Sequence, residues 1–261
     1  EQVAFWHQAH SFVRGNWGNE ARSTFMLLAK SCHDIDYLSY LVGAPCARVA
    51  SSGSLSYFTE ANAPEGSADR CVNGCRVERD CPYSAIKAYV EAEHLERWPA
   101  EVCSPVHTTA AHLEAITTGP YGRCVYRCDN DVVDHQVVLL EYAGGVTATF
   151  TMTAFTQQGG RRVRVNGTAG TIDFDESTIT VRTFADNNVE TIALGAESGG
   201  HGGGDWRVVN AWLRAIKSND AALILTDAQE SLRTHTIVFA AEKARTAGRM
   251  VAMAEMAEEP V

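Results

Sequence analysis

The sequence has no long hydrophobic run, no basic leader and no surplus of positive charge. No apolar stretch in its 261 residues approaches the roughly 20 residues that a membrane span requires. The opening EQVAFWHQAH lacks the basic n-region of a secretory signal. The net charge of −10 disfavours nucleic acid and anionic membrane surfaces as partners. These absences predict a cytoplasmic protein that binds neither nucleic acid nor a membrane.

Two phosphate-binding patterns are also absent. Neither GxxxxGK[ST] nor a GxGxxG between a strand and a helix occurs, so the chain alone is not expected to bind a dinucleotide. The chain opens without Met and runs directly into an apparent strand, which we interpret as the mark of a longer protein. The glycines of residues 199–205 (GGHGGGD) precede a helix. They form either an anion site that includes His201 or a flexible lead-in with Asp205 as N-cap.

An apolar content of 45% and a charged content of 21% are ordinary for a globular protein, and we expect one domain over residues 1–261. Helices are expected at residues 84–97, 108–118, 205–218 and 227–248, and early strands at 3–7 and 47–58. Seven segments that alternate or are β-branched, separated by turn residues, predict an antiparallel meander. They are residues 123–128, 136–142, 146–155, 161–166, 171–174, 178–184 and 189–194. The predicted class is α+β, an open, mostly antiparallel sheet with helices on one face.

Eight cysteines are spaced unevenly, which favours a reduced compartment over a disulfide framework. Cys71, Cys75 and Cys81 lie in a polar insertion at about residues 59–83 that has no periodicity. Three thiolates so close together suggest a structural zinc site, which typically takes four ligands. One disulfide with a third thiol, or three unlinked thiols, are the alternatives.

Residues 23–43 form the segment around which the chain is organised. Leu28, Cys32, Ile35, Leu38 and Val42 recur at three- and four-residue steps, as in a helix with a buried face, and Gly43 with Pro45 ends it. A second stripe carries polar groups that suit acid/base chemistry. It holds Lys30, His33 and Tyr37, with Asp34 and Asp36 within one turn. Ordinary ion pairs on a solvated helix face are the alternative.

The segment WHQAHSFVRGNWGN, residues 6–19, is dense in rings and charge. His10, Arg14 and Trp17 lie within eight residues. Aromatic faces with charged donors on a loop suit a polar ring such as a sugar. The alternative is a loop anchored by its tryptophans, with solvated histidines.

Read together, several segments resemble the C-terminal domain of the Gfo/Idh/MocA (glucose–fructose oxidoreductase, inositol dehydrogenase, rhizopine catabolism) family over essentially the whole chain. They are SCHDIDYLSYLVG, ARVASSGS, GGVTATFTM, RRVRVNGTAGTI, HGGGD and AAEKARTAGRMV. The resemblance implies that NAD or NADP is bound by an N-terminal Rossmann domain, absent from these residues together with the family's Glu-Lys-Pro motif. It also implies a sugar or polyol substrate and homo-oligomers formed through the open sheet face.

The resemblance assigns proton transfer to His33. Many relatives have an aspartate four residues before this histidine, but Ala29 stands there, with Lys30 next. We therefore expect Lys30 and His33 as catalytic residues, and His10, Arg14, Trp17, Asp36, Tyr37 and His201 as substrate contacts. The leading hypothesis is the substrate domain of an NAD(P)-dependent sugar or polyol oxidoreductase, inactive alone. The alternatives are a redox-assisted glycoside hydrolase and a non-catalytic sugar-binding or assembly module.

Overall fold

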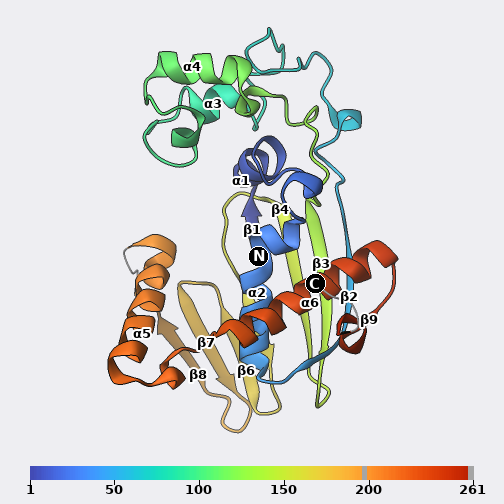
Figure 1. The fold of residues 1–261 in the computed structure, drawn as a ribbon, viewed down its shortest axis with the longest axis vertical. Helices are drawn as coiled ribbons and strands as arrows, with labels where there is room; N and C mark the ends of the chain where they lie inside the picture. The colour runs from blue at the N-terminus through green and yellow to red at the C-terminus, as the bar shows by residue number, and fades with distance from the viewer. Residues whose placement is uncertain (196–198, 258–261) are drawn as a thin grey trace. The chain divides into compact units, whose positions relative to one another are not determined.

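The computed structural model describes residues 1–195 and 199–257 (Figure 1). The chain divides into two compact units, Glu1–Gly159 with His235–Val261, and Gly160–Thr234. Each unit combines helices with a sheet whose strands pair mostly antiparallel, so the predicted α+β class is confirmed. One functional domain over residues 1–261 stays a prediction.

The first unit is built on a five-stranded sheet of order β1-β4-β3-β2-β9. All pairs are antiparallel except β1 with β4. The strands are β1 (Gln2–Ala4), β2 (Cys46–Ser54), β3 (His135–Tyr142), β4 (Thr147–Thr156) and β9 (Val251–Ala252). The expected strand at residues 3–7 is shorter than predicted because Phe5–His7 already forms helix α1.

Side chains alternate across this sheet, so one face is buried. Val138 and Leu140 on β3 and Phe150 and Met152 on β4 point into the core, while their neighbours point outward. Helix α2 (Met26–Val42) and the part of α6 (Ala228–Ala247) that belongs to this unit contribute to the same core. The helices therefore cover one face of the sheet, as expected.

Helix α2 differs in detail from the prediction. It begins at Met26 instead of residue 23, and its N-cap is Phe25, which makes no side-chain cap. Gly43 ends it in the left-handed conformation, at φ 65°, where glycine is favoured.

A long excursion between β2 and β3 carries α3 (Ala85–Tyr89), a 3₁₀ turn (Ala100–Cys103), α4 (Thr109–Thr118) and a second turn (Pro120–Gly122). Helix α4 is confirmed, with the Thr108 side chain accepting from the Ala111 N–H. The helix expected at residues 84–97 stops at Tyr89, because the acidic stretch that follows supplies almost no apolar face to bury.

The strand expected at residues 123–128 is wrong. Its backbone bonds are local or go to the insertion: Cys124 N–H donates to Asp69, and Arg127 N–H donates to Cys124. A single bridge between Arg123 and Arg70 is the only sheet-like pairing of this stretch within the described residues.

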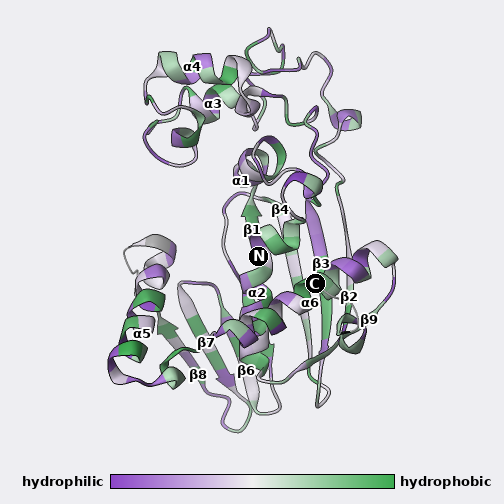
Figure 2. Cartoon of the chain, in the orientation of Figure 1, coloured by the Kyte–Doolittle hydropathy of each residue, from purple (hydrophilic) through white to green (hydrophobic). Residues whose placement is uncertain are grey.

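The second unit holds an antiparallel sheet of order β5-β6-β7-β8. Its strands are β5 (Val163–Asn166), β6 (Gly170–Phe174), β7 (Thr178–Thr183) and β8 (Val189–Ala193). Helix α5 (Gly204–Ser218) begins after the N-cap Gly203, so Asp205 lies inside the first turn instead of capping it. Hydrophobic residues recur along α5 (Figure 2), and several are exposed, including Trp206 and Trp212.

No helix in the described part of the chain is both long and apolar enough to cross a membrane.

Candidate functional site

Two ion pairs lie at the side of α2 next to β1. The Lys30 Nζ atom is 3.2 Å from Glu1 Oε1, and His33 Nε2 is 3.1 Å from Asp34 Oδ2. The Asp34 side chain is buried, while that of His33 is 52% exposed. A buried carboxylate therefore holds one edge of an imidazole that remains accessible, which is an arrangement that orients a histidine for proton transfer.

The same residues form one compact group. Potential metal-ligand atoms of Glu1, His33 and Asp34 lie within 4.8 Å of one another. Among residues 1–195 and 199–257, this is the only such group of three or more His, Cys, Asp or Glu side chains. The Lys30 ammonium already neutralises the Glu1 carboxylate here.

The structure does not support the predicted zinc site. Cys71, Cys75, Cys81 and the distant Cys124 line a cavity of about 20 Å³, which has room for one water. Their sulfur atoms form no group of three within 4.8 Å in the described chain. Burial raises the pKa of the Cys81 and Cys124 thiols, which opposes the thiolate form that zinc requires.

The ring-rich segment before α2 folds as an irregular helix. Helix α1 (Phe5–His7) runs directly into a π-helix, Gln8–Arg14. π-helical turns are rare and concentrate at functional sites, where the wider turn re-aims side chains. The irregularity therefore marks this segment as a candidate site in its own right.

Two histidines of this segment are uncharged at neutral pH. Burial, with a smaller contribution from the Lys30 ammonium, lowers the pKa of His7 to about 4. Burial, with smaller contributions from His7 and Arg14, lowers the pKa of His10 to about 4. The influence of Lys30 on His7 also shows that the ion pairs on α2 adjoin this segment.

Tryptophan and tyrosine rings surround these histidines. Trp6 stacks on His7, and His10 stacks on Tyr121 with ring centroids 4.9 Å apart. His10 Nδ1 also lies 2.9 Å from the Tyr89 hydroxyl. Trp98 comes from the excursion after α3 and lies near-perpendicular to both histidine rings. The result is an aromatic cluster, Trp6, His7, His10, Trp98 and Tyr121, beside Lys30.

Arg14 differs from the expectation of a substrate contact. Its side chain is buried, and its guanidinium donates to the backbone carbonyls of Arg123 (2.7 Å) and Tyr83 (2.6 Å) and to Cys71 Sγ (3.8 Å). These contacts join the π-helix to the excursion, so the role that they indicate for Arg14 is to hold these two segments together.

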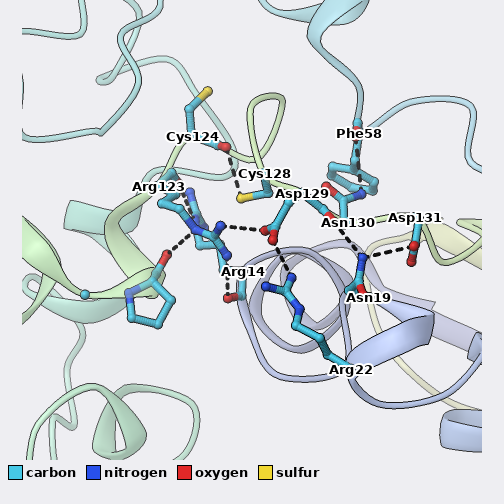
Figure 3. Close-up of polar contacts among 12 residues, drawn as sticks. Arg14, Asn19, Arg22, Phe58, Arg123, Cys124, Cys128, Asp129, Asn130 and Asp131 are labelled. Atoms are coloured by element: carbon cyan, nitrogen blue, oxygen red, sulfur yellow. Dashed lines mark hydrogen bonds and ion pairs between the residues drawn. The ribbon is translucent and has the colours of Figure 1, made fainter.

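A charged network holds the same loop from its other end. The Asp129 carboxylate pairs with both Arg22 and Arg123, and Asn19 donates to Asp131 Oδ2 at 2.9 Å (Figure 3). The acidic turn at residues 129–135 thus receives side chains from the segment that precedes α2. The network fixes where the loop of the candidate site runs.

The other predicted contacts are distributed differently. Trp17 is exposed after the π-helix, and Asp36 and Tyr37 follow His33 on α2. His201 belongs to the second unit, where its Nδ1 lies 2.8 Å from Asp205 Oδ1. His10, Lys30 and His33 are the predicted residues that the first unit brings to one region.

Sequence reasoning missed His7, Tyr89, Trp98 and Tyr121. A signal existed for Trp98, since a tryptophan before a proline in a polar stretch has no core of its own to fill. The rings that it meets, from Trp6 to His10, lie 87 to 91 intervening residues away, and no local pattern encodes the path between them.

Comparisons with known proteins identify the family of the chain. Residues 2–253 match the family described as "Oxidoreductase family, C-terminal alpha/beta domain", Gfo/Idh/MocA. "Putative oxidoreductase YteT" of Bacillus subtilis (strain 168) is 27% identical over 221 residues, covering 77% of this chain and 49% of that protein.

Solved structures share the fold at low identity. Levoglucosan dehydrogenase in complex with NADH and levoglucosan gives a TM-score of 0.58 at 14% identity, over 96% of this chain and 56% of that one. An oxidoreductase from Agrobacterium radiobacter in complex with NAD+, L-tartaric acid and magnesium gives 0.57 at 13%, over 98% and 56%. The chain thus spans about half the length of these relatives. Because the family match runs over nearly all of it, this chain belongs to the Gfo/Idh/MocA oxidoreductases, as their C-terminal α/β domain.

Proposed function

We propose that this domain binds a sugar or polyol and supplies acid/base groups to an NAD(P)-dependent oxidoreductase. The observation that carries the proposal is the accessible His33 imidazole, held by the buried Asp34 carboxylate, with the Lys30 ammonium beside it. The ring-rich loop adjoins this group, and rings with polar edges are typical of sugar sites.

Within this proposal, the residues of the chain handle the proton. Oxidising an alcohol requires a base that takes the hydroxyl proton as the hydride leaves, and histidine is the side chain whose ordinary pKa lies nearest neutrality, which suits His33 to this role. The Asp34 carboxylate stabilises the imidazolium that then forms. Lys30 donates to the substrate oxygen. It takes the role of the aspartate that many relatives have at the position of Ala29.

A nicotinamide cofactor would accept the hydride, and we assign its binding to another domain of the full-length protein. The described residues contain one parallel strand pair, β1 with β4, and the glycines that precede α5 do not have the GxGxxG spacing of a dinucleotide-binding loop. They therefore do not fit a dinucleotide by themselves. We further propose a cytoplasmic homo-oligomer that associates through the outer face of the five-stranded sheet.

The test uses the full-length protein with NAD or NADP and a panel of sugars and polyols. His33→Gln keeps an amide donor for Asp34 but removes the base, so kcat should fall roughly a hundredfold or more with the fold intact. Lys30→Ala should have a comparable effect if Lys30 acts directly on the substrate. NAD(P)H absorbance measures turnover, and circular dichroism checks the fold.

The matched control is His135→Gln. His135 also pairs with a buried aspartate, Asp134, at 2.8 Å, but its side chain alternates with those that enter the core, so it points away from α2. Near-normal kcat in folded His33→Gln would refute the proposed role. Release of nitrophenol from a nitrophenyl glycoside without net NAD(P)H formation would instead indicate the redox-assisted hydrolase. Sugar binding without either reaction would indicate a non-catalytic module.

A further inference from the structure

The aromatic cluster extends past the residues that the proposed chemistry needs. Trp98 is 45% exposed and Trp6 is 38% exposed, although their rings touch with centroids 5.3 Å apart. The contact between the two rings therefore covers only part of each indole. The two indoles therefore present an accessible aromatic surface beside the buried part of the cluster.

The inner layer fixes this surface in place. His7 lies 4.9 Å and His10 5.3 Å from the Trp98 ring, both near-perpendicular to it. His10 is in turn held by the Tyr89 hydroxyl and by stacking on Tyr121. A tryptophan supported on this many sides keeps one orientation, which lowers the entropy cost of binding against it.

The chemistry of the cluster selects an uncharged ligand. Both imidazoles are neutral at pH 7, so the surface offers rings and single hydrogen-bonding nitrogens without a net charge. Amphipathic rings bind ligands that have both an apolar face and polar edges. A pyranose fits that description, because its axial C–H groups form an apolar face and its hydroxyls lie at the rim.

The surface lies in the neighbourhood of the acid/base group. His7 lies close enough to feel the Lys30 ammonium, Lys30 contacts Glu1, and Glu1 lies with His33 and Asp34. In this series His7, Lys30 and Glu1 stand between Trp98 and His33. A ring on Trp98 is thus a second ring and not the one presented to His33.

We propose that Trp98 and Trp6 form a second sugar subsite, which stacks the ring adjacent to the one that meets His33. This inference rests on the proposed function and refines its substrate class: the ligand is a glycoside of at least two rings. The excursion between β2 and β3 supplies Trp98, so this segment sets the length of ligand that the domain accepts.

The experiment probes the full-length protein, with its nicotinamide cofactor, on an array of defined glycans of one to four rings. Wild type should retain glycans of two or more rings in preference to their component monosaccharides. Trp98→Ala should weaken the retained disaccharide's Kd about tenfold and leave monosaccharide binding unchanged. Trp98→Phe, which keeps a ring, should stay within about threefold of wild type. The matched control, Trp206→Ala, removes an exposed indole from α5 and should leave binding unchanged.

Three results would overturn the subsite. The first is retention of no glycan longer than one ring, and the second is equal retention by wild type and Trp98→Ala. The third is a lower melting temperature of Trp98→Ala and Trp98→Phe with unaltered glycan binding, which would mean that another domain covers the indole. Two-ring binding lost in Trp98→Ala without any sugar oxidation would support the subsite and refute the oxidoreductase function alone.

Discussion

His7 and His10 make the stability of the first unit depend on pH. Burial lowers both pKa values to about 4, whereas an unfolded histidine titrates near 6.5. Between pH 6.5 and 4 the unfolded chain binds more protons, so this contribution to stability is complete above pH 6.5 and is lost as pH falls toward 4.

His10→Phe removes one of these titrations. We expect its melting temperature to fall less steeply than that of wild type between pH 6.5 and 4, even if it starts lower because the bond to Tyr89 is lost. Thermal melts followed by circular dichroism measure the slopes, with His94→Phe, at an exposed histidine, as control. Identical slopes for His10→Phe and wild type would contradict the assignment.

At this scale the sequence predicted residue types better than their burial. The polar stripe of Lys30 and His33 on one helix follows from the helical period, and the structure places them together. Arg14 has the same charge as an exposed arginine, but three acceptors in the interior bind it. Those acceptors lie 57 to 109 residues away, so only the folded path of the chain shows them.

Helix α2 shows the same limit at the scale of an element. The predicted stripe follows Leu28, Cys32 and Ile35, but the most buried positions are Leu27, Ser31, Ile35 and Ser39. Small serines let the helix lie close to the sheet. The Ser39 hydroxyl donates a hydrogen bond to the Ile35 carbonyl at 2.9 Å, so it needs no partner outside the helix. A hydrophobic pattern counts apolar residues only. The buried face that it predicted is therefore rotated slightly from the observed one, and it could not show that Asp34 is buried.

The turn after α4 sets the position of Tyr121 in the aromatic cluster. A Cβ added at Gly122 would lie 1.7 Å from the Ile116 carbonyl oxygen, a contact that backbone atoms cannot relieve without moving. We expect Gly122→Ala to lower the free energy of unfolding by about 1–3 kcal/mol, the usual cost of overpacking. Because the shift displaces Tyr121 from His10, glycan binding should weaken as well.

Urea denaturation measures this effect, and Gly167→Ala is the control. A Cβ at Gly167 meets its nearest atom, the Gly170 oxygen, at an ordinary 3.5 Å. Equal stability of the two alanine variants would show that the turn accommodates a side chain and that Tyr121 is not fixed by it.

For the whole molecule, sequence order predicted which strands pair only where the turns are tight. The pairs β3–β4, β5–β6, β6–β7 and β7–β8 follow the predicted meander, and the sheet breaks between β4 and β5. Two short strands, β1 and β9, complete the first sheet from opposite ends of the chain. Pairing over that separation depends on burial of the shared core, and strands of three and two residues carry little pattern of their own.

The outer face of the five-stranded sheet lies opposite the face that packs in the core of the first unit. Cross-strand rows on it combine small and apolar side chains, as in Ser52–Val137–Thr151 and Ala50–Leu139–Thr149. Ion pairs lie at its two ends, Arg48 with Glu141 at one and His135 with Asp134 at the other. A flat surface with few charges and an exposed Val137 is typical of a face that a partner covers.

We therefore expect the protein to self-associate through this face and Val137→Arg to prevent it. A stable dimer buries about 1,200–2,000 Å² in total, and a guanidinium at the centre of such an interface would be desolvated without a matched carboxylate. Light scattering should report a multiple of the monomer mass for wild type and the monomer for Val137→Arg. Leu113→Arg on α4 is the matched control, because Leu113 and Val137 are both 45% exposed, and its mass should equal that of wild type. A wild-type monomer at high concentration would contradict self-association, and an oligomer that persists in Val137→Arg would place the interface elsewhere.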